Sequence, residues 1–318
     1  MKYIKVAVIL ILIGLLPVQA VNVVCSIPDF VPIVKAVGRE KVNVTSIMPP
    51  GSDPHSFTLT KSIMDSIETS DLILLVNSEF LHFEEKISEK YGEKCLDFKD
   101  YRANGAHLDR FPKYSKNPHG YWLKLDNGIA IAKTVAKALS NISPEDAEYF
   151  ERNLHVFVDE INDSKEVTNE IVDEYNLKNK SCVAVVPGVC YIIQNMGMKV
   201  EDVLLGEELG FASGKSIANI EKKLKEEYDF IVIPEFMKNS KAGEIAKQLS
   251  IDTGKPIIYV KFVMANENES YIALHYKNLI RFVGYKKEVV KNSSYEILLM
   301  LAMLVVIFIS LLKIKGVL

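Results

Sequence analysis

The stretch that decides the fold is SPEDAEYFERNLHVFVDEINDSKEVTNEIVDEYNL, which runs from Ser143 to Leu177. Ser143 can cap a helix, Pro144 suits its first turn, and the acidic residues that follow favour its positive end. Apolar residues then recur at steps of three and four, interrupted only at Ser164 and Thr168, so they share one helical face. We predict one helix from Pro144 to Leu177, about 34 residues and ~50 Å long, and a helix of that length usually joins two parts of a molecule.

Short apolar runs of strand type alternate with helical patterns on both sides of this helix. The strand-like runs before it are Val21–Cys25, Val42–Ile47 and Leu72–Val76, and those after it are Cys182–Val186, Val200–Leu204, Phe230–Ile233 and Ile257–Val260. The helical patterns are Pro32–Val37, Ser62–Glu68, Ile129–Ser140, Tyr191–Met196, Ile217–Tyr228, Lys241–Asp252 and Tyr271–Val283. Such alternation is typical of parallel sheets flanked by helices. We predict an α/β fold with two lobes, residues 21–142 and 178–290, joined by the helix over 143–177, with a ligand cleft between the strand ends.

The first twenty residues have the pattern of a secretory signal. Lys2 and Lys5 give a positive start, Val6–Leu16 is an uncharged apolar run, and Pro17–Ala20 supplies small residues for cleavage. A buried first strand or an uncleaved anchor is the alternative. We predict a signal peptide over residues 1–20 and hence an exported protein.

A second apolar run, Tyr295–Leu312, lies near the C-terminus. Eighteen helical residues span ~27 Å, which is just sufficient for the hydrocarbon core of a membrane. Lys313 and Lys315 follow it, as expected for a cytoplasmic end, although lysines also precede it. A buried core helix is the alternative. We predict a single-pass anchor over 295–312 that holds the folded body at the extracytoplasmic face of the cell membrane.

The charge of the body excludes one class of partner. Residues 21–294 carry 34 basic and 40 acidic side chains, a net charge of −6. An acidic body argues against nucleic-acid binding and mildly favours cations. We expect a monomer.

Cysteines and asparagines leave two further possibilities open. Cys25, Cys95, Cys182 and Cys190 could form two local disulfides, Cys25–Cys95 and Cys182–Cys190, or remain buried thiols. Six Asn-x-Ser/Thr triplets could carry glycans in an exported protein, although such triplets also arise by chance. These begin at Asn43, Asn141, Asn162, Asn179, Asn268 and Asn292.

Two histidines lie in loops that the sequence stiffens. His55 is in PPGSDPHSF, residues 49–57, directly after a predicted strand, and His119 is in NPHGYWL, residues 117–123, before a predicted helix. Prolines and a turn glycine limit the conformations of such loops. Neutral imidazole is a ligand for zinc, manganese or iron, and a preorganised loop lowers the cost of assembling a site. A surface or hydrogen-bonding role is the alternative for each histidine.

With these two loops the chain resembles the zinc- and manganese-type metal receptors of ABC importers (cluster A-I), whose two lobes are joined by one long helix. In that family the pattern Pro-Pro-Gly-x-Asp-Pro-His-x-Phe/Tyr carries a first metal ligand, which matches residues 49–57. A second pattern, Asp/Asn-Pro-His-x-Trp-Leu, matches residues 117–123 with one extra residue. The resemblance spans about residues 20 to 285. It implies that His55 and His119 bind a divalent transition metal, with zinc or manganese favoured.

The second lobe departs from the family pattern. The resemblance implies a third ligand, His or Glu, near Val186–Cys190, and a fourth, Asp, near Tyr259–Phe262, but neither residue type is present there. Lys261 would repel a cation. Glu235 after a strand end and Cys190 as a thiolate are possible substitutes, and His107 could deliver ions transiently. A solvated glutamate, a buried thiol and a surface histidine are the respective alternatives, and water could complete a looser site.

Three functions follow, in decreasing order of support. The first is a binding protein without catalysis that captures zinc, manganese or iron for an ABC permease at the membrane. The second is a receptor of the same fold that binds a metal chelate or an anionic solute, because Lys261 stands where an acidic residue is implied. The third is a metal-dependent hydrolase with Asp53 or Glu235 as general base. No nucleophile motif such as Gly-x-Ser-x-Gly supports the third.

Overall fold

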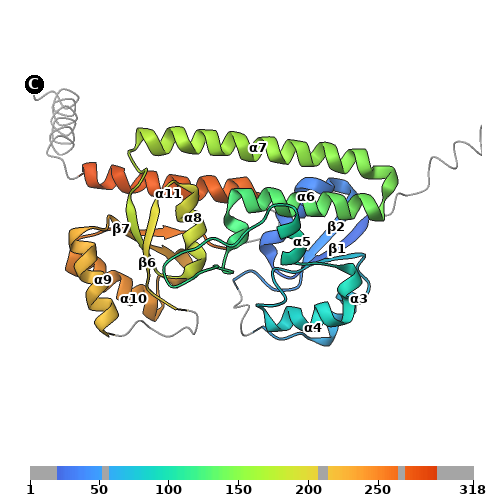
Figure 1. The fold of residues 1–318 in the computed structure, drawn as a ribbon, viewed down its shortest axis with the longest axis horizontal. Helices are drawn as coiled ribbons and strands as arrows, with labels where there is room; N and C mark the ends of the chain where they lie inside the picture. Colours follow the sequence, from blue (N-terminus) through green and yellow to red (C-terminus); the bar gives the residue numbers. More distant parts are fainter. Residues whose placement is uncertain (1–19, 52–56, 207–213, 264–268, 292–318) are drawn as a thin grey trace, which may run out of the picture.

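The fold consists of two α/β lobes beneath one long helix (Figure 1). The computed structural model describes residues 20–51, 57–206, 214–263 and 269–291. The predicted signal peptide apart from Ala20, His55 and the predicted anchor over 295–312 lie outside the described residues. Among the helices that are described, none is long and apolar enough to cross a membrane.

The first lobe contains a parallel sheet with the strand order β2-β1-β3-β4. Val21 of β1 is opposite Val42 of β2, and Val23 is opposite Leu72 of β3. The strands are β1 (Val21–Cys25), β2 (Val42–Ser46), β3 (Leu72–Leu74) and β4 (Cys95–Leu96). The helices are α2 (Val31–Gly38), α3 (Lys61–Glu68), α4 (His82–Tyr91), α5 (Phe98–Ala103) and α6 (Leu125–Ile142), with 3-10 turns η1 (Pro28–Phe30), η2 (Arg39–Lys41), η3 (Gly92–Lys94) and η4 (Tyr121–Leu123).

The second lobe repeats this arrangement. Its sheet is again parallel and has the order β6-β5-β7-β8, so the first strand of each lobe is central and the second lies at an edge. The strands are β5 (Ser181–Ala184), β6 (Lys199–Val203), β7 (Phe230–Pro234) and β8 (Ile257–Val260). The helices are α8 (Cys190–Asn195), α9 (Gly214–Glu226), α10 (Lys241–Thr253) and α11 (Tyr271–Lys291), with turns η6 (Pro187–Val189) and η7 (Glu235–Met237). The prediction of two parallel sheets flanked by helices is confirmed.

The connecting helix α7 spans both lobes and is shorter than predicted (Figure 1). The chain first makes a 3-10 turn, η5 (Pro144–Asp146), and α7 then runs over Ala147–Glu174, 28 residues or ~42 Å. Asn176 ends it with a φ of +52°, a left-handed conformation that asparagine tolerates and that stops a helix. The predicted helix over Pro144–Leu177 was therefore too long at both ends.

The polar interruptions in the apolar stripe of α7 are buried. Ser164 donates to the carbonyl of Ile161 at 2.8 Å, and Thr168 donates to the carbonyl of Ser164 at 2.6 Å. Each hydroxyl thus donates its proton within its own helix and leaves the buried face intact. His275 of α11 contacts Thr168 Oγ1 at 2.7 Å, which joins the last helix to the connecting helix.

All four cysteines lie in described strands or helices, and none of them forms a disulfide. Cys25, Cys182 and Cys190 are buried, and Cys95 is partly buried. Burial raises the pKa of the Cys95 thiol to about 12 and that of Cys182 well above its ordinary value. The sequence left open whether the cysteines form two disulfides or remain thiols, and in the structure they are thiols.

Candidate metal site between the lobes

The strand order defines where a ligand can approach each sheet. In both lobes the chain goes from the central strand to one edge and then crosses to the other side, so the switch points lie between β1 and β3 and between β5 and β7. Ligands of open parallel sheets bind beyond the carboxyl ends of the strands at such points. Glu235 follows β7, one of the strands at a switch point, and residues 47–51 follow the carboxyl end of β2, the neighbour of β1.

A cavity of about 200 Å³ opens where the two lobes meet at these strand ends. It is lined from the first lobe by the start of the first histidine loop and from the second lobe by residues after β7 and β8. Its lining residues are Pro50, Gly51, Glu235, Phe236, Lys261, Phe262 and Val263. The structure therefore brings the described start of the first histidine loop and the substitute ligand Glu235 to one space.

His119 is held in one tautomer by Asn117. The Asn117 Nδ2 donates to the carbonyl of Pro187 at 2.9 Å, which turns the amide oxygen toward the histidine. That oxygen lies 3.1 Å from His119 Nδ1, and because it can only accept, Nδ1 carries the proton. The lone pair is then on Nε2. A ring nitrogen oriented by a hydrogen bond on its other side is the usual arrangement of a metal-binding histidine.

Aromatic rings further restrict the half-buried His119. Its ring centroid is 4.7 Å from that of Phe80 and 5.6 Å from that of Tyr114, both edge-to-face. Gly120 continues the loop with a φ of +69°. A Cβ at this position would lie 2.7 Å from the carbonyl oxygen of Gly188 and 3.0 Å from the Phe262 ring, so only glycine permits the second lobe to pack here.

Glu235 is available at the cavity but is already paired. Its carboxylate accepts from Arg281 of α11 at 2.5 Å, and the Glu235 side chain is 45% exposed. The second nitrogen of the same guanidinium donates to the carbonyl of Tyr259 at 2.8 Å. A metal would therefore have to compete with Arg281 for this carboxylate.

The charge of Lys261 is largely offset by a neighbour that the sequence did not reveal. Its ammonium donates to both oxygens of Glu269, at 2.7 and 2.6 Å, and Glu269 is almost fully buried. Lys277 also pairs with Glu269, at 2.5 Å. Lys261, Lys277 and Glu269 together carry a net charge of +1. Lys261 therefore repels a cation in the cavity less strongly than its position in the sequence suggests.

Cys190 is not exposed to the cavity. It is the first residue of α8, its exposed fraction is zero, and burial raises the pKa of its thiol well above the ordinary value. A thiol with so high a pKa stays protonated at neutral pH, whereas a metal ligand must be a thiolate. The structure therefore provides no support for Cys190 as a ligand.

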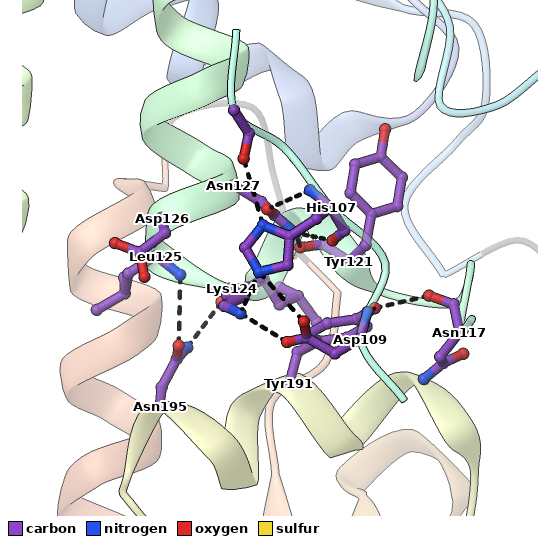
Figure 2. Close-up of polar contacts among 12 residues, drawn as sticks. His107, Asp109, Asn117, Tyr121, Lys124, Leu125, Asp126, Asn127, Tyr191 and Asn195 are labelled. Atoms are coloured by element: carbon purple, nitrogen blue, oxygen red, sulfur yellow. Dashed lines mark hydrogen bonds and ion pairs between the residues drawn. The ribbon is translucent and has the colours of Figure 1, made fainter. Parts of the chain in front are cut away.

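His107 lies in a polar cluster at the junction of the lobes (Figure 2). Its Nε2 is 2.8 Å from Lys124 Nζ and 3.1 Å from Asp109 Oδ1, while Lys124 Nζ donates to Asp109 Oδ2 at 2.6 Å. The nitrogen that would bind an ion is thus engaged by a cation and a carboxylate. This arrangement favours a structural role for His107 over transient delivery of ions.

Tyr191 connects this cluster to the second lobe (Figure 2). Its hydroxyl accepts from the backbone N–H of Asp109 at 3.0 Å and donates to the carbonyl of Asn117 at 2.7 Å. Asn195, also on α8, donates to the carbonyl of Leu123 at 2.8 Å and accepts from the N–H of Leu125 at 3.3 Å. The loop that contains His119 is therefore held by side chains of the opposite lobe.

The described residues hold only part of the predicted ligand set. His119, Glu235 and Cys190 are described, while His55 is not. Within the described ranges, no group of three or more His, Cys, Asp or Glu side chains gathers as a metal site would require. Sequence reasoning missed the roles of Arg281, Glu269 and Phe262, because these partners come from distant segments and have no motif of their own.

A family model matches most of the chain. Residues 23–284 match the zinc-uptake complex component A, periplasmic (ZnuA). The chain belongs to this family. The predicted resemblance to metal receptors of ABC importers is confirmed, and the matched family consists of periplasmic components of uptake complexes, which are not enzymes.

Characterised relatives of the family share about half of their length with the chain. A metal ABC transporter substrate-binding lipoprotein, ScbA of Streptococcus cristatus, is 30% identical over 171 residues, which cover 48% of this chain and 53% of the relative. The manganese ABC transporter substrate-binding lipoprotein PsaA of Streptococcus mitis is 30% identical over 174 residues, 50% of this chain and 55% of the relative. An iron ABC transporter lipoprotein, MtsA of Streptococcus pyogenes, is 30% identical over 135 residues, 39% of this chain and 42% of the relative.

Solved structures share the fold at low identity. The substrate-binding protein FpvC of Pseudomonas aeruginosa, solved with Mn²⁺, superposes with a TM-score of 0.69 at 16% identity and covers 85% of this chain and all of that one. Zn(II)-bound AdcA of Streptococcus pneumoniae superposes with a TM-score of 0.64 at 20% identity, covering 84% of this chain and 57% of that one. These structures support the two-lobe fold.

Proposed function

We propose that this protein captures a divalent transition metal, zinc or manganese, outside the cytoplasm and delivers it to an ABC importer. The observation that carries the proposal is the cavity at which Pro50 and Gly51, the start of the first histidine loop, meet Glu235. His119, whose tautomer Asn117 fixes, does not line this cavity, but its neighbour Gly120 packs against Phe262 of the lining. The relatives named for manganese, iron and zinc are consistent with this class of substrate.

In this proposal His119 Nε2 and His55 are the ligands from the first lobe. His55 follows Gly51, a cavity residue, by four positions in the sequence. Glu235 is the candidate from the second lobe and would exchange Arg281 for the metal. Cys190 is the least favoured of the four predicted ligands because its thiol is buried and protonated. Water would fill the remaining positions.

Calorimetric titration of the purified protein with Zn²⁺ and Mn²⁺ tests the proposal. We expect His119→Ala and His55→Ala each to weaken binding by at least about 100-fold, because loss of a direct ligand should exceed the effect of losing its hydrogen-bond partner. His155→Ala is the matched control, since His155 is exposed on α7 and is not among the residues that line the cavity. Unchanged affinity in both histidine variants would overturn the proposal.

A metal chelate is the second candidate substrate. Lys261, Lys277 and Arg281 gather behind the cavity, and their partners Glu269 and Glu235 offset only part of their charge. A carboxylate chelator could pair with these cations and occupy coordination positions that the second lobe leaves open. Titration with the metal alone and with its citrate complex separates the two candidates. If the substrate is a chelate, the complex should bind more tightly than the bare metal, and Lys261→Gln should abolish this difference in affinity.

We further propose that residues 295–312 anchor the body to the membrane as a single-pass helix. The length and apolarity of this segment support an anchor, and the lysines that follow it support a cytoplasmic end. Fractionation of cells that express the full chain and a chain ending at residue 291 would test it. The full chain should sediment with membranes and the shortened one should not.

A further inference from the structure

Asparagine triplets for glycosylation are more frequent in this chain than chance predicts. Serine and threonine together make up 29 of the 318 residues. By chance, about two of the 19 asparagines should therefore have a serine or threonine two positions later. Six are, and in none of the six is the intervening residue proline. Such triplets are the acceptor sequence for N-glycosylation in exported proteins, so their number motivates a search for glycan-bearing positions.

The asparagines of the described triplets lie at the surface. Asn43, Asn141, Asn162 and Asn179 are exposed. Asn268 and Asn292 lie outside the described residues. Exposure is not a general property of asparagine in this fold, because several asparagines outside triplets are buried, namely Asn77, Asn117, Asn127, Asn153 and Asn278. The triplets thus coincide with surface positions where an attached sugar would meet solvent.

Helix α7 runs along one side of the molecule, which we call the α7 edge (Figure 1). Each of the four positions lies on α7, in a segment next to it in the chain, or near the amino end of a strand. Asn141 is in the last turn of α6, Asn162 is within α7, and Asn179 lies between α7 and β5. Asn43 is near the start of β2, two residues after Lys41, whose ammonium pairs at 2.9 Å with Asp146, the last residue of η5 before α7. The cavity, by contrast, is lined by residues that follow the carboxyl ends of β2, β7 and β8.

We propose that Asn43, Asn141, Asn162 and Asn179 carry N-linked glycans and that the α7 edge is the glycan-bearing face of the protein. The proposal rests on the export of the chain but not on its metal binding. In the reaction Asn Nδ2 forms a bond to C1 of an oligosaccharide carried on a lipid phosphate. The bond from C1 to the phosphate oxygen breaks, the lipid phosphate leaves, and the amide loses one proton. Hydrated sugars on this edge would direct an importer to the cavity side.

The structure also assigns an order of events at Asn162. The hydroxyl of its triplet belongs to Ser164, which has no exposed surface and donates within α7 to the carbonyl of Ile161 at 2.8 Å. Recognition of that hydroxyl therefore requires α7 to be unfolded, so Asn162 is modified before the chain folds. Asn179 lies in a turn and Asn141 lies at the C-terminal end of α6, next to its partly buried C-cap Ser143, so modification at both is compatible with the folded state.

Mass spectrometry of the full chain from the cells that produce it tests the proposal. We expect an intact mass above that of the polypeptide and saccharide-bearing peptides that contain the four asparagines. Asn→Gln at each position should remove one glycan mass, whereas Asn169→Gln, an exposed residue of α7 outside any triplet, should remove none. A saccharide at any of the four supports the proposal for that position, and four unmodified asparagines overturn it. Metal titration of the same samples keeps this result separate from the proposed function.

Discussion

The amide of Asn117 contacts both lobes, and its two atoms have separable roles. Nδ2 donates to the Pro187 carbonyl of the second lobe, while Oδ1 accepts from His119 in the first. Asn117 itself is fully buried, so neither contact can be replaced by water without rearrangement. One residue thus connects the orientation of a candidate ligand to the contact between the lobes.

Two substitutions at this position should separate the roles. Asn117→Asp keeps an acceptor for His119 but loses the donor to Pro187, so we expect the free energy of unfolding to fall by about 1–3 kcal/mol while metal affinity changes little. Asn117→Ala removes both contacts and should also weaken metal binding by about 10–100-fold. Denaturant unfolding and metal titration measure the two effects. Equal metal affinity in the two variants would contradict the positioning role.

The buried His275 makes the free energy of unfolding decrease at acid pH. Burial lowers its pKa to about 4 from an ordinary 6.5, so between these values the unfolded chain binds a proton that the folded protein does not. Stability is therefore complete above pH 6.5 and falls as the pH drops toward 4, by about 3 kcal/mol in all. His275→Gln should lose this part of the pH dependence in denaturant titrations at pH 4.5 and 7. His155→Gln, at an exposed site, should keep it.

Glu84 changes the free energy of unfolding with pH in the direction opposite to His275. Its carboxylate is fully buried, accepting from the N–H groups of Val76 and Asn77 at 2.9 and 2.8 Å, and burial raises its pKa to about 7 from 4.5. The folded protein holds a proton between pH 4.5 and 7 that the unfolded chain releases, so stability falls as the pH rises through this window. The stability of Glu84→Gln relative to the parent should therefore increase from pH 4.5 to 7. A difference that stays constant with pH would contradict this assignment.

At the scale of elements, helix α6 packs on α11 through a glycine. A Cβ on Gly128 would lie 2.5 Å from the Tyr271 hydroxyl, which is buried and held by the carbonyls of Trp122 and Lys124 at 2.7 and 3.2 Å. The tyrosine has no room to retreat without losing these hydrogen bonds. The approach of the two helices therefore depends on the absence of a side chain at residue 128.

We expect Gly128→Ala to lower the free energy of unfolding by about 1–3 kcal/mol through overpacking. Gly92→Ala is the matched control, because Gly92 has a helical φ of −51° and open space around its Cα. That substitution should be neutral or slightly stabilising. Thermal unfolding of the two variants checks the difference, and an equal effect would show that the contact with Tyr271 is unimportant.

Elements with strong apolar patterns could be predicted, and those without them could not. β1 and β8 have the predicted bounds, since their apolar runs end abruptly at polar or turn residues. Helix α4 was missed because only Phe83, Glu84 and Ile87 are buried in a segment that is otherwise charged. β4 was missed because two residues carry no periodicity. In the site, the two histidine loops could be found because each has a local sequence pattern. The partners of Glu235 and Lys261 could not, because Arg281 lies in α11 and Glu269 lies just before it, far along the chain.

At the scale of the whole molecule, the two lobes are held together by side chains that bond to the backbone of the opposite lobe. Tyr191 and Asn195 of α8 bond to the loop over 109–125, and Tyr271 of α11 bonds to the same loop. Gly120 and Gly188 allow direct backbone contact beside Phe262. Together with α7, these contacts oppose a wide hinge motion, so closure over a ligand should be small and local.

The same contacts predict that the lobes unfold together. Trp122, the only tryptophan, lies in η4 within the interlobe loop, so its fluorescence reports that region while circular dichroism reports all helices. We expect both signals to give one coincident denaturant transition, as in a two-state protein.

Tyr191→Phe leaves the N–H of Asp109 and the carbonyl of Asn117 without this partner. It should lower the free energy of unfolding by about 2 kcal/mol, with the tryptophan signal changing at lower denaturant. Tyr259→Phe, at a partly exposed site on β8, should shift stability by less than about 0.5 kcal/mol. Separate transitions in the parent protein would mean that the interlobe hydrogen bonds contribute little, and the stiffness attributed to them would then have to reside in α7 alone.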